Sequence, residues 1–480
     1  MSARAALLID FGSTYTKLRA VDLEGRKLLG TGQGPSTVTS DITIGMQAAL
    51  GDLEERLGQL PDFRYRLASS SAAGGLKMVT VGLVKELTAE AARFAALGAG
   101  ARLVDTFAYE LSRRDVASII GHEPDIILLA GGTDGGNSEV ILHNAEKLSA
   151  SDITCPIIVA GNRSAADEVE DILRAAGKDV RLTDNVMPSL GTLDIEPARA
   201  AIRTVFIERI IHAKGLDQAH DFFDALLMPT PAAVLEAAKL LSDGPHGHGG
   251  LGPLLVVDIG GATTDVYSVA DGEPTEGRIL QHGLPEPFAK RTVEGDLGMR
   301  HNAGEIIEAA GKDTVAVLAD AQVPEMAALL KQISADVERL PKSKKERAFD
   351  AALAQSAVRI AVKRHAGTVE IVHTVNGPVA AQRGKDLSPV ATVIGTGGAL
   401  VYGRKPSSIL SGCLYSEDEP NSLRPRDPAL LVDANYMLYA AGLLAEAEPD
   451  AAFDFARLSL EPVSAMSEKE GENELRLTSG

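Results

Sequence analysis

The sequence predicts an α/β protein built from two similar domains. Apolar runs of strand length alternate with alanine-rich helical stretches, which is typical of α/β proteins. Residues 7–21 and 255–269 are variants of one another: each is an apolar strand that ends in Asp, turns on Gly and small hydroxyl residues, and returns as a second strand. The chain of 480 residues is also too long for one hydrophobic core. We therefore expect one such hairpin to open each of two domains.

Composition restricts the environment and the partners. Hydrophobic residues make up 45% of the chain, yet no apolar run reaches the roughly 18 residues that a membrane helix needs. The N-terminus shows no separate hydrophobic leader region, and the two cysteines, Cys155 and Cys413, are too few for a disulfide framework. A net charge of -19 and an aromatic content of 4% argue against nucleic acid as a partner. We expect a cytoplasmic protein that binds neither membranes nor nucleic acid.

Composition shifts along the chain predict the domain boundaries. The first domain is expected over 1–245, with an inserted α/β unit at about 79–190, and 196–241 is expected to be helical with an interruption at 228–231. A Gly- and His-rich connection leads to a second domain over 250–405, with a helical insertion at about 300–366. The remainder, 406–480, is expected to be a helical segment followed by a disordered acidic tail.

Both Asp-Gly turns contain the residues that a metal–phosphate site needs. Asp10 and Asp258 end their strands and should project carboxylates from the rim of a sheet, while the Gly two residues later allows a tight turn. If the carboxylates face each other across a cleft, they suit Mg²⁺, which keeps several waters and takes other ligands from phosphates. Successive amides of each turn could form an anion-binding concavity. The predicted phosphate-binding residues of the turns are Gly12, Ser13, Thr14, Tyr15, Gly260, Gly261, Ala262 and Thr263.

Lys17 and Asp265 occupy the same register position, seven residues beyond Asp10 and Asp258. Because strand side chains alternate, both could return toward the cleft, Lys17 as a charge on phosphate and Asp265 as a further ligand of metal or water. A single Asp-x-Gly is usually only a hairpin turn, but two copies in register favour a site. A third turn, with Gly395, Thr396, Gly397 and Gly398, closes a strand at 391–394 and is expected to lie against the base or ribose.

The order of these motifs resembles the ATPase superfamily of actin, sugar kinases and heat-shock chaperones. Residues 10–17 and 258–265 are similar to its two phosphate motifs, 394–398 to its adenosine motif, and 229–233 to its first connecting helix. The resemblance implies two RNase H-like (actin-like ATPase) domains that clamp Mg-ATP. Where the chaperones have Glu before Pro-Thr, this chain has Met228. Hydrolysis is therefore expected to be slow, or Asp265 or another acid positions the attacking water.

Three longer runs, 70–78, 129–136 and 293–300, resemble the MutL (GlmL) family associated with glutamate mutase, which is unrelated to the mismatch-repair protein of that name. The likeness extends to about residue 440. It implies an accessory ATPase for an adenosylcobalamin-dependent mutase, whose subunits are its partners. The implied role is a reactivating chaperone that uses ATP-driven domain motion to release damaged cobalamin. Self-association as a homodimer is left open.

Two other functions are compatible with the same motifs. A small-molecule kinase, acting on a sugar or a carboxylic acid, would need an Asp base near a substrate pocket. An actin-like scaffold would polymerise with ATP. Glu294 and Asp296 could reach the metal waters or lie in a solvated turn, and 130–136 could bind a ligand at a strand's end or be a structural loop.

Overall fold

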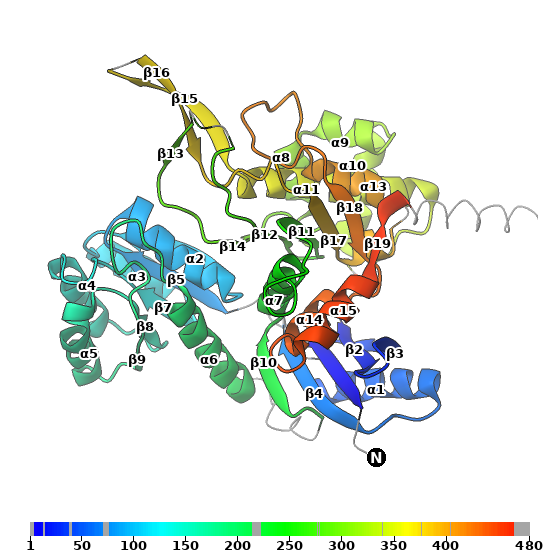
Figure 1. Cartoon of the computed structure of the whole chain (residues 1–480), viewed down its shortest axis with the longest axis horizontal. Helices are drawn as coiled ribbons and strands as arrows, with labels where there is room; N and C mark the ends of the chain where they lie inside the picture. The colour runs from blue at the N-terminus through cyan, green and yellow to red at the C-terminus, as the bar shows by residue number, and fades with distance from the viewer. Residues whose placement is uncertain are drawn as a thin grey trace, which may run out of the picture. The chain divides into compact units, whose positions relative to one another are not determined.

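The computed structural model describes residues 4–12, 15–37, 41–70, 76–213, 222–275, 277, 279–337, 339–375, 377–403 and 405–464 (Figure 1). The chain divides into two compact units. The first comprises 1–236, 283–287 and 442–446, and the second comprises 237–282, 288–441 and 447–480. The chain passes from the first unit to the second inside helix α7 (Thr230–Asp243). The predicted phosphate-binding residues Ser13 and Thr14, the run 71–75 and the predicted acidic tail from 465 onward lie outside the described residues.

The first unit contains a five-stranded sheet, here called the N-terminal sheet. Its strands are β1 (Ala5–Phe11), β2 (Tyr15–Asp22), β3 (Lys27–Pro35), β4 (Phe63–Ser70) and β10 (Ala225–Pro229), in the order β10-β4-β1-β2-β3. β2 and β3 are antiparallel to their neighbours, whereas β4 and β10 run parallel to β1. Alternate residues of β1 pack in one core with helix α1 (Ile42–Leu57). This is the strand arrangement expected of an RNase H-like domain.

One element of the N-terminal sheet corrects a prediction. The stretch 196–241 was expected to be an interrupted helix, but it contains helix α6 (Glu196–Ala213), strand β10 and helix α7. β10 lies beside β4 and places Met228 next to Ser69. The helical prediction was wrong here because a short apolar run lacks the periodicity that separates strand from helix.

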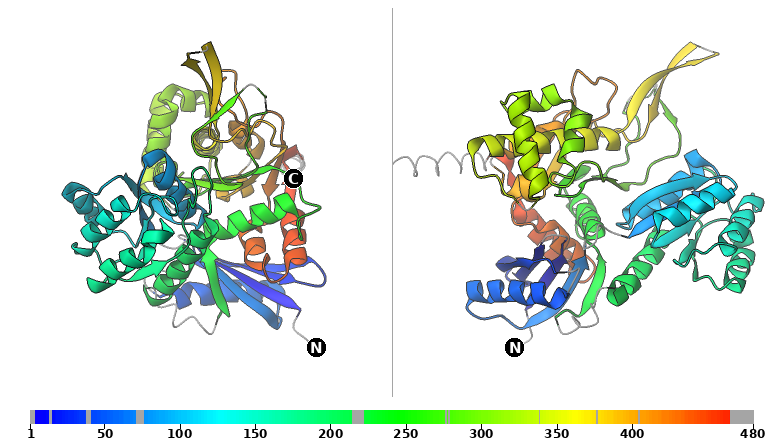
Figure 2. Two further views of the ribbon diagram at one scale, coloured as in Figure 1. Left: turned by 60° about the vertical axis from the view of Figure 1, so that its left-hand side comes forward. Right: turned by 180° about the vertical axis from the view of Figure 1, so that it is seen from behind.

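The inserted α/β unit has a fully parallel sheet, here called the insert sheet. Its strands are β5 (Lys77–Gly82), β6 (Arg102–Ala108), β7 (Ile126–Leu129), β8 (Ile157–Val159) and β9 (Val180–Leu182), in the order β6-β5-β7-β8-β9. Ile126 and Leu128 belong to one core cluster, while Ile127 and Leu129 belong to another. Both faces are therefore covered, as parallel sheets require. The covering helices, seen in Figure 2, include α2 (Glu90–Gly98), α3 (Arg113–His122), α4 (Glu139–Ser149) and α5 (Ala166–Ala175).

The second unit repeats the strand arrangement of the first. Its C-terminal sheet has the order β14-β12-β11-β17-β18-β19, from β11 (Leu254–Ile259), β12 (Thr264–Val269), β14 (Ala289–Glu294), β17 (Thr392–Thr396), β18 (Ala429–Asp433) and β19 (Leu460–Pro462). β12 and β14 are antiparallel and β17 and β18 parallel, as in the N-terminal sheet. The two RNase H-like domains expected from the sequence are thereby confirmed, with an inserted α/β subdomain in the first.

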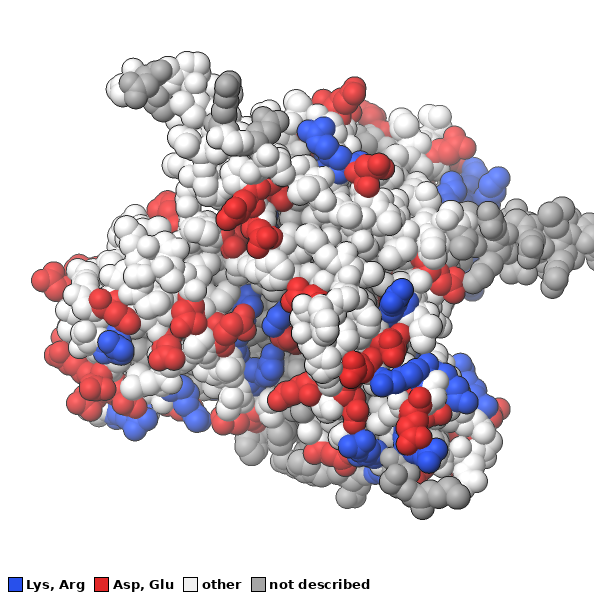
Figure 3. Space-filling model, viewed as in Figure 1, with Lys and Arg blue, Asp and Glu red and all other residues white. Residues whose placement is uncertain are grey.

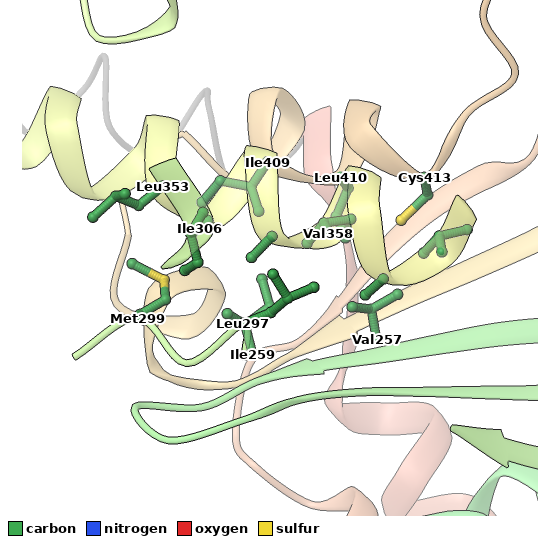
Figure 4. Packing of buried hydrophobic residues seen from close by; sticks show 14 of the residues in the cluster. Val257, Ile259, Leu297, Met299, Ile306, Leu353, Val358, Ile409, Leu410 and Cys413 are labelled. Carbon is green, nitrogen blue, oxygen red and sulfur yellow. The ribbon is translucent and has the colours of Figure 1, made fainter. Parts of the chain in front are cut away.

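The core of the second unit lies between the C-terminal sheet and a long helix. Val257 and Ile259 of β11 pack with Leu353 and Val358 of helix α11 (Lys344–His365), and Cys413 completes the same cluster (Figure 4). The helical insertion expected at 300–366 consists of α8 (Ala303–Ala310), α9 (Lys312–Leu318), α10 (Val323–Ala335) and α11.

The end of the chain differs from the prediction of a helical segment after 405. Helices α13 (Pro406–Leu410), α14 (Leu438–Leu444) and α15 (Pro449–Ser459) are present, but β18 and β19 extend the C-terminal sheet. The apolar run of β18 pairs with β17, which only the fold reveals. A small sheet of β13 (Leu280–His282), β15 (Thr368–Thr374) and β16 (Gly377–Arg383) was not predicted at all. Several apolar side chains of this sheet are exposed. Because no face of the sheet is consistently buried, its strands lack the alternation of apolar and polar residues by which a strand is predicted.

The helices and the charged side chains of one face have the following features. Within the described part of the chain, no helix is both long and apolar enough to cross a membrane. On the face drawn in Figure 3, the described acidic and basic side chains are interspersed and form no broad basic patch. That face lacks the clustered Lys and Arg by which nucleic acid is bound.

Candidate functional site

The two predicted turns are closed by the same backbone hydrogen bond. The Gly12 amide donates to the Tyr15 carbonyl at 3.0 Å, and the Gly260 amide donates to the Thr263 carbonyl at 2.9 Å. A Cβ on Gly12 would lie 2.6 Å from that Tyr15 oxygen, so the turn requires glycine. These two amides are already engaged inside their turns. The amides further along, such as those of Gly261 and Ala262, are the ones left for the predicted contact with phosphate.

The strand registers show which residues lie opposite Asp10 and Asp258. Asp10 is directly opposite Lys17 in the first hairpin, and Asp258 is directly opposite Asp265 in the second. Opposite residues in an antiparallel pair lie on the same face of the sheet. Each hairpin therefore brings its two predicted side chains together, Asp with Lys in one unit and Asp with Asp in the other.

Asp10 is a buried carboxylate with two different neighbours. Its side chain is only 6% exposed, and its Oδ2 lies 3.9 Å from the Nζ of Lys17. Its Oδ1 accepts a hydrogen bond of 2.7 Å from the hydroxyl of Thr230. Burial raises the pKa of Asp10 above its usual value, while Lys17 and the Thr230 hydrogen bond partly oppose that rise. Keeping the ionised carboxylate of Asp10 buried costs folding free energy. Buried carboxylates with a shifted pKa are common at functional sites.

Thr230 and Ser69 are neighbours of Asp10 that the sequence did not reveal. Ser69 is opposite Asp10 on β4, and its Oγ lies 3.2 Å from the Oγ1 of Thr230. Thr230 is the first residue of α7, directly after β10. The one available signal was the Pro-Thr-Pro run at 229–231, which restricts the backbone at a helix start.

Met228 occupies the position where the resemblance would have a glutamate. It pairs with Ser69 in the sheet and is 6% exposed. Its thioether cannot orient a water as a carboxylate does. No acid therefore stands at this position of the N-terminal sheet.

The third predicted turn is adjacent to the second within the second unit. β17 runs parallel to β11 and places Thr396 opposite Asp258. Gly397 has φ of +100°, and a Cβ there would lie 2.3 Å from the Ile259 carbonyl oxygen. Gly397 therefore supplies both a left-handed backbone and a close approach between the two turns. The structure brings Asp258, the Gly260 turn and the Gly395–398 turn to one edge of the C-terminal sheet.

Asp265 is held by a buried arginine from the neighbouring strand. Nε and Nη2 of Arg291 donate to Asp265 Oδ1 at 2.9 and 2.6 Å, and the Thr263 hydroxyl donates to Oδ2 at 3.0 Å. The side chain of Asp265 is 10% exposed and that of Arg291 is 4% exposed. Burial alone would lower the pKa of Arg291, but the charge of Asp265 raises it above its usual value. The negative charge of Asp265 is thus compensated by Arg291, and its direct role at a metal stays a prediction.

The run 293–300 supports the turn that begins at Gly260. Amides of Met299 and Arg300 donate to the carbonyls of Gly260 and Gly261 at 3.2 and 2.9 Å. The Arg300 guanidinium binds both carboxylate oxygens of Asp350 on α11. Residues of the run 293–300, which resembles the MutL family, therefore hold the backbone of this turn through hydrogen bonds.

We expect Gly298→Ala to disturb this turn, because the new Cβ would lie 2.3 Å from the backbone of Ala262. Overpacking of this kind costs about 1–3 kcal/mol of unfolding free energy. Thermal unfolding and ATP titration should both show a loss. Gly295→Ala is the matched control, since nothing lies within 4 Å of its Cβ. Equal behaviour of the two variants would contradict the supporting role of this segment.

Glu294 and Asp296 are tied to one arginine. Arg364 binds Asp296 through two bonds of 2.9 Å and Glu294 at 2.5 Å. The hydrogen bond from Arg364, with its charge, lowers the pKa of Asp296 despite partial burial. This arrangement ties both carboxylates to one arginine, which favours the structural alternative for this turn.

The run 130–136 is a rigid loop at the end of β7 in the insert. Buried Asn162 donates to the carbonyls of Gly136 and Asn137 and accepts from the Gly135 amide. Buried Asn185 donates to the Gly132 carbonyl at 3.0 Å. Two asparagines thus hold the loop's shape, which favours the structural interpretation of this run.

The donor chemistry at both turns fits magnesium that is held mainly by water and phosphate. Carboxylate oxygens are hard ligands of the kind that Mg²⁺ prefers. Among the described residues, no three His, Cys, Asp or Glu side chains gather closely enough to hold a metal by themselves. A Mg²⁺ ion held by one carboxylate of a unit would therefore need the phosphates of a bound nucleotide as further ligands.

Comparison with solved structures gives only distant likenesses. The chain is similar to xylulose kinase from Bifidobacterium adolescentis, at 12% identity and a TM-score of 0.32, over 98% of this chain and 100% of that chain. A glycerol dehydratase reactivase gives 11% identity and a TM-score of 0.34, over 93% of this chain and 100% of that chain. Both TM-scores are below 0.5, and it is the strand order of the two sheets that identifies the fold.

Comparison of sequences is more specific. A family model described as MutL protein matches residues 6–460. The chain is 48% identical over 449 residues to the curated Protein MutL of Clostridium tetanomorphum, covering 93% of this chain and 97% of that protein. A match of this identity over nearly the whole length of both proteins places the two in one family. The chain belongs to the MutL family.

Proposed function

We propose that this chain is an ATP-binding and slowly ATP-hydrolysing accessory protein, a reactivating chaperone for an adenosylcobalamin-dependent mutase such as glutamate mutase. The observation that carries the nucleotide part is a repetition. Two sheets of the same strand order each present a carboxylate, Asp10 or Asp258, beside a glycine turn closed by the same hydrogen bond. Chance hairpins have no reason to share strand order, register and the closing hydrogen bond together.

The residues have separate tasks in this proposal. Asp10 and Asp258 hold the waters of Mg²⁺, and Lys17 meets the phosphates as a positive point charge. The amides beyond Gly12 and Gly260 bind phosphate oxygens, and the turn at Gly395–398 meets the adenosine. Mg²⁺, when bound with ATP, neutralises phosphate charge and polarises the phosphoryl group. Buried Met228 offers no carboxylate for the attacking water, which supports slow hydrolysis.

The state of the cysteines supports a place in the reducing cytoplasm. Cys155 and Cys413 are free and buried. Burial raises the pKa of Cys155 to about 11 and that of Cys413 to about 12. Both therefore remain unreactive thiols that pack as small hydrophobic side chains.

The mutase part of the proposal rests on membership of the MutL family and on the association that the sequence resemblance implies. ATP would act by binding one conformation of the protein more tightly than another, since only a difference in affinity shifts such an equilibrium. The mutase subunits would respond to that conformation. Release of the nucleotide, or of its γ-phosphate, would restore the starting state.

The test is release of damaged cobalamin from a purified mutase. We expect the chain with Mg-ATP to release cobalamin from an inactivated mutase complex, followed by absorbance after gel filtration, and to restore activity when adenosylcobalamin is added. ADP in place of ATP should give little release, and Asp10→Asn should give none. Absence of ATP-dependent release would contradict the chaperone role. A phosphorylated sugar or carboxylic acid, formed from labelled ATP, would indicate the kinase instead.

A further inference from the structure

Thr230 holds one oxygen of the predicted metal-binding carboxylate, and we infer that it is a positioning residue for Asp10. Its Oγ1 lies 2.7 Å from Asp10 Oδ1. The two residues are 220 positions apart in the chain. This inference rests on the proposed nucleotide-binding function and adds to it a residue that does not itself touch the nucleotide.

The hydrogen-bond arithmetic assigns the donor. A threonine hydroxyl has one hydrogen, and an ionised carboxylate only accepts, so the Thr230 hydrogen belongs to Asp10. Ser69 Oγ lies 3.2 Å from Thr230 Oγ1, and its own hydroxyl donates to the Ile9 carbonyl at 3.4 Å. The anchoring bond to Asp10 Oδ1 therefore comes from Thr230 alone.

The two oxygens of Asp10 therefore have different roles. Oδ1 is anchored by Thr230, while Oδ2 faces Lys17 at 3.9 Å, beyond ordinary hydrogen-bond length. Hydrogen bonds to an ionised acceptor are roughly twice as strong as neutral ones. Anchoring Oδ1 fixes the carboxylate before any ligand arrives and leaves Oδ2 for a further partner. A carboxylate fixed in advance loses less rotamer freedom on binding.

The backbone places Thr230 there by a simple route. β10 runs alongside β4 and ends at Pro229, and α7 starts at Thr230. Pro231 follows in the first helical turn, where a missing N–H costs nothing and a fixed φ favours the helix start. The branched Cβ of threonine restricts χ1, so the hydroxyl has few alternative directions.

Two variants of Thr230 separate the hydroxyl from the shape of the side chain, and a third variant is the control. Thr230→Val keeps the branched shape and removes the hydroxyl, whereas Thr230→Ser keeps the hydroxyl. Thr80→Val is the matched control, because Thr80 is a fully buried residue of the same unit whose hydroxyl lies 3.0 Å from that of Thr106 in the insert sheet. Calorimetric titration of the full chain with ATP, once with Mg²⁺ and once with EDTA, measures the affinity of each variant.

We expect Thr230→Val to weaken Mg-dependent ATP binding by about tenfold to a hundredfold, the usual effect of losing a partner that orients a metal ligand. Its ATP affinity in EDTA should stay within about twofold, and Thr230→Ser should stay within about threefold of the wild type in both conditions. Thr80→Val should bind as the wild type does.

Two results would overturn this inference: equal Mg-ATP affinity in Thr230→Val and the wild type, or an equal loss in Thr230→Ser and Thr230→Val. The second result would assign the loss to packing rather than to the hydroxyl. A wild-type chain that binds no ATP, or binds it equally with and without Mg²⁺, would instead overturn the proposed nucleotide site. The failure of one idea is therefore distinct from the failure of the other.

Discussion

Asp10→Asn is expected to abolish Mg-dependent ATP binding while leaving the fold at least as stable as the wild type. Even groups that reach a metal only through its waters affect affinity by about 10- to 100-fold. The fold should not suffer, because burial raises the pKa of Asp10 and its ionised form costs free energy at neutral pH. An asparagine removes that cost and still offers an oxygen to the Thr230 hydroxyl, which donates at 2.7 Å in the wild type. A gain in stability with a loss of function is the usual sign of a functional residue.

Thermal unfolding without ligand and ATP titration with Mg²⁺ together test this prediction. Asp179→Asn is a matched control: it removes the same charge from the same unit, at an exposed pair with Arg181. We expect that control to change neither measurement, since exposed pairs contribute about 0–1 kcal/mol. An Asp10→Asn variant with normal Mg-ATP affinity would show that the carboxylate is not part of the metal site. One that unfolds at a lower temperature would show that Asp10 is mainly structural.

The hairpins could be predicted because their information is local. Lys17 lies seven positions after Asp10, and a tight turn between them permits one register, which the structure has. The same holds for Asp258 and Asp265. Repetition of the pattern also indicated two domains of one kind. Local spacing with a repeated motif was therefore enough for the fold class and for the placing of these charges.

The partners of these charges could not be predicted, because they come from distant segments. Thr230 reaches Asp10 only because β10 joins the N-terminal sheet, and the sequence of β10 was interpreted as helix. Arg291 reaches Asp265 because β14 pairs Tyr267 with Arg291. A shift of one residue in that register would turn Lys290 toward this face instead. The pairing of β12 with β14 decides whether Arg291 or Lys290 reaches Asp265. The two strands are joined by a connecting segment, and neither composition nor residue spacing predicts how they pair.

Arg291→Met is expected to destabilise the second unit strongly. The guanidinium holds a carboxylate that is 10% exposed, so its removal leaves a buried charge without compensation. Losing one partner of a buried ion pair costs about 3–5 kcal/mol of unfolding free energy. Unfolding in denaturant measures this loss, and an unchanged free energy of unfolding would contradict it.

The double variant Asp265→Asn with Arg291→Met distinguishes a structural role of Asp265 from a role as a metal ligand. We expect it to recover most of the lost stability, because replacing a buried pair together is often nearly neutral. Because Asp265 is predicted to be a further ligand of metal or water, we expect this variant to bind ATP with a weaker dependence on Mg²⁺ even where its stability returns. In the wild type, both oxygens of Asp265 also accept hydrogen bonds, Oδ1 from Arg291 and Oδ2 from Thr263. Restored stability with the Mg-ATP affinity of the wild type would contradict the metal role and leave Asp265 a structural residue beside Asp258.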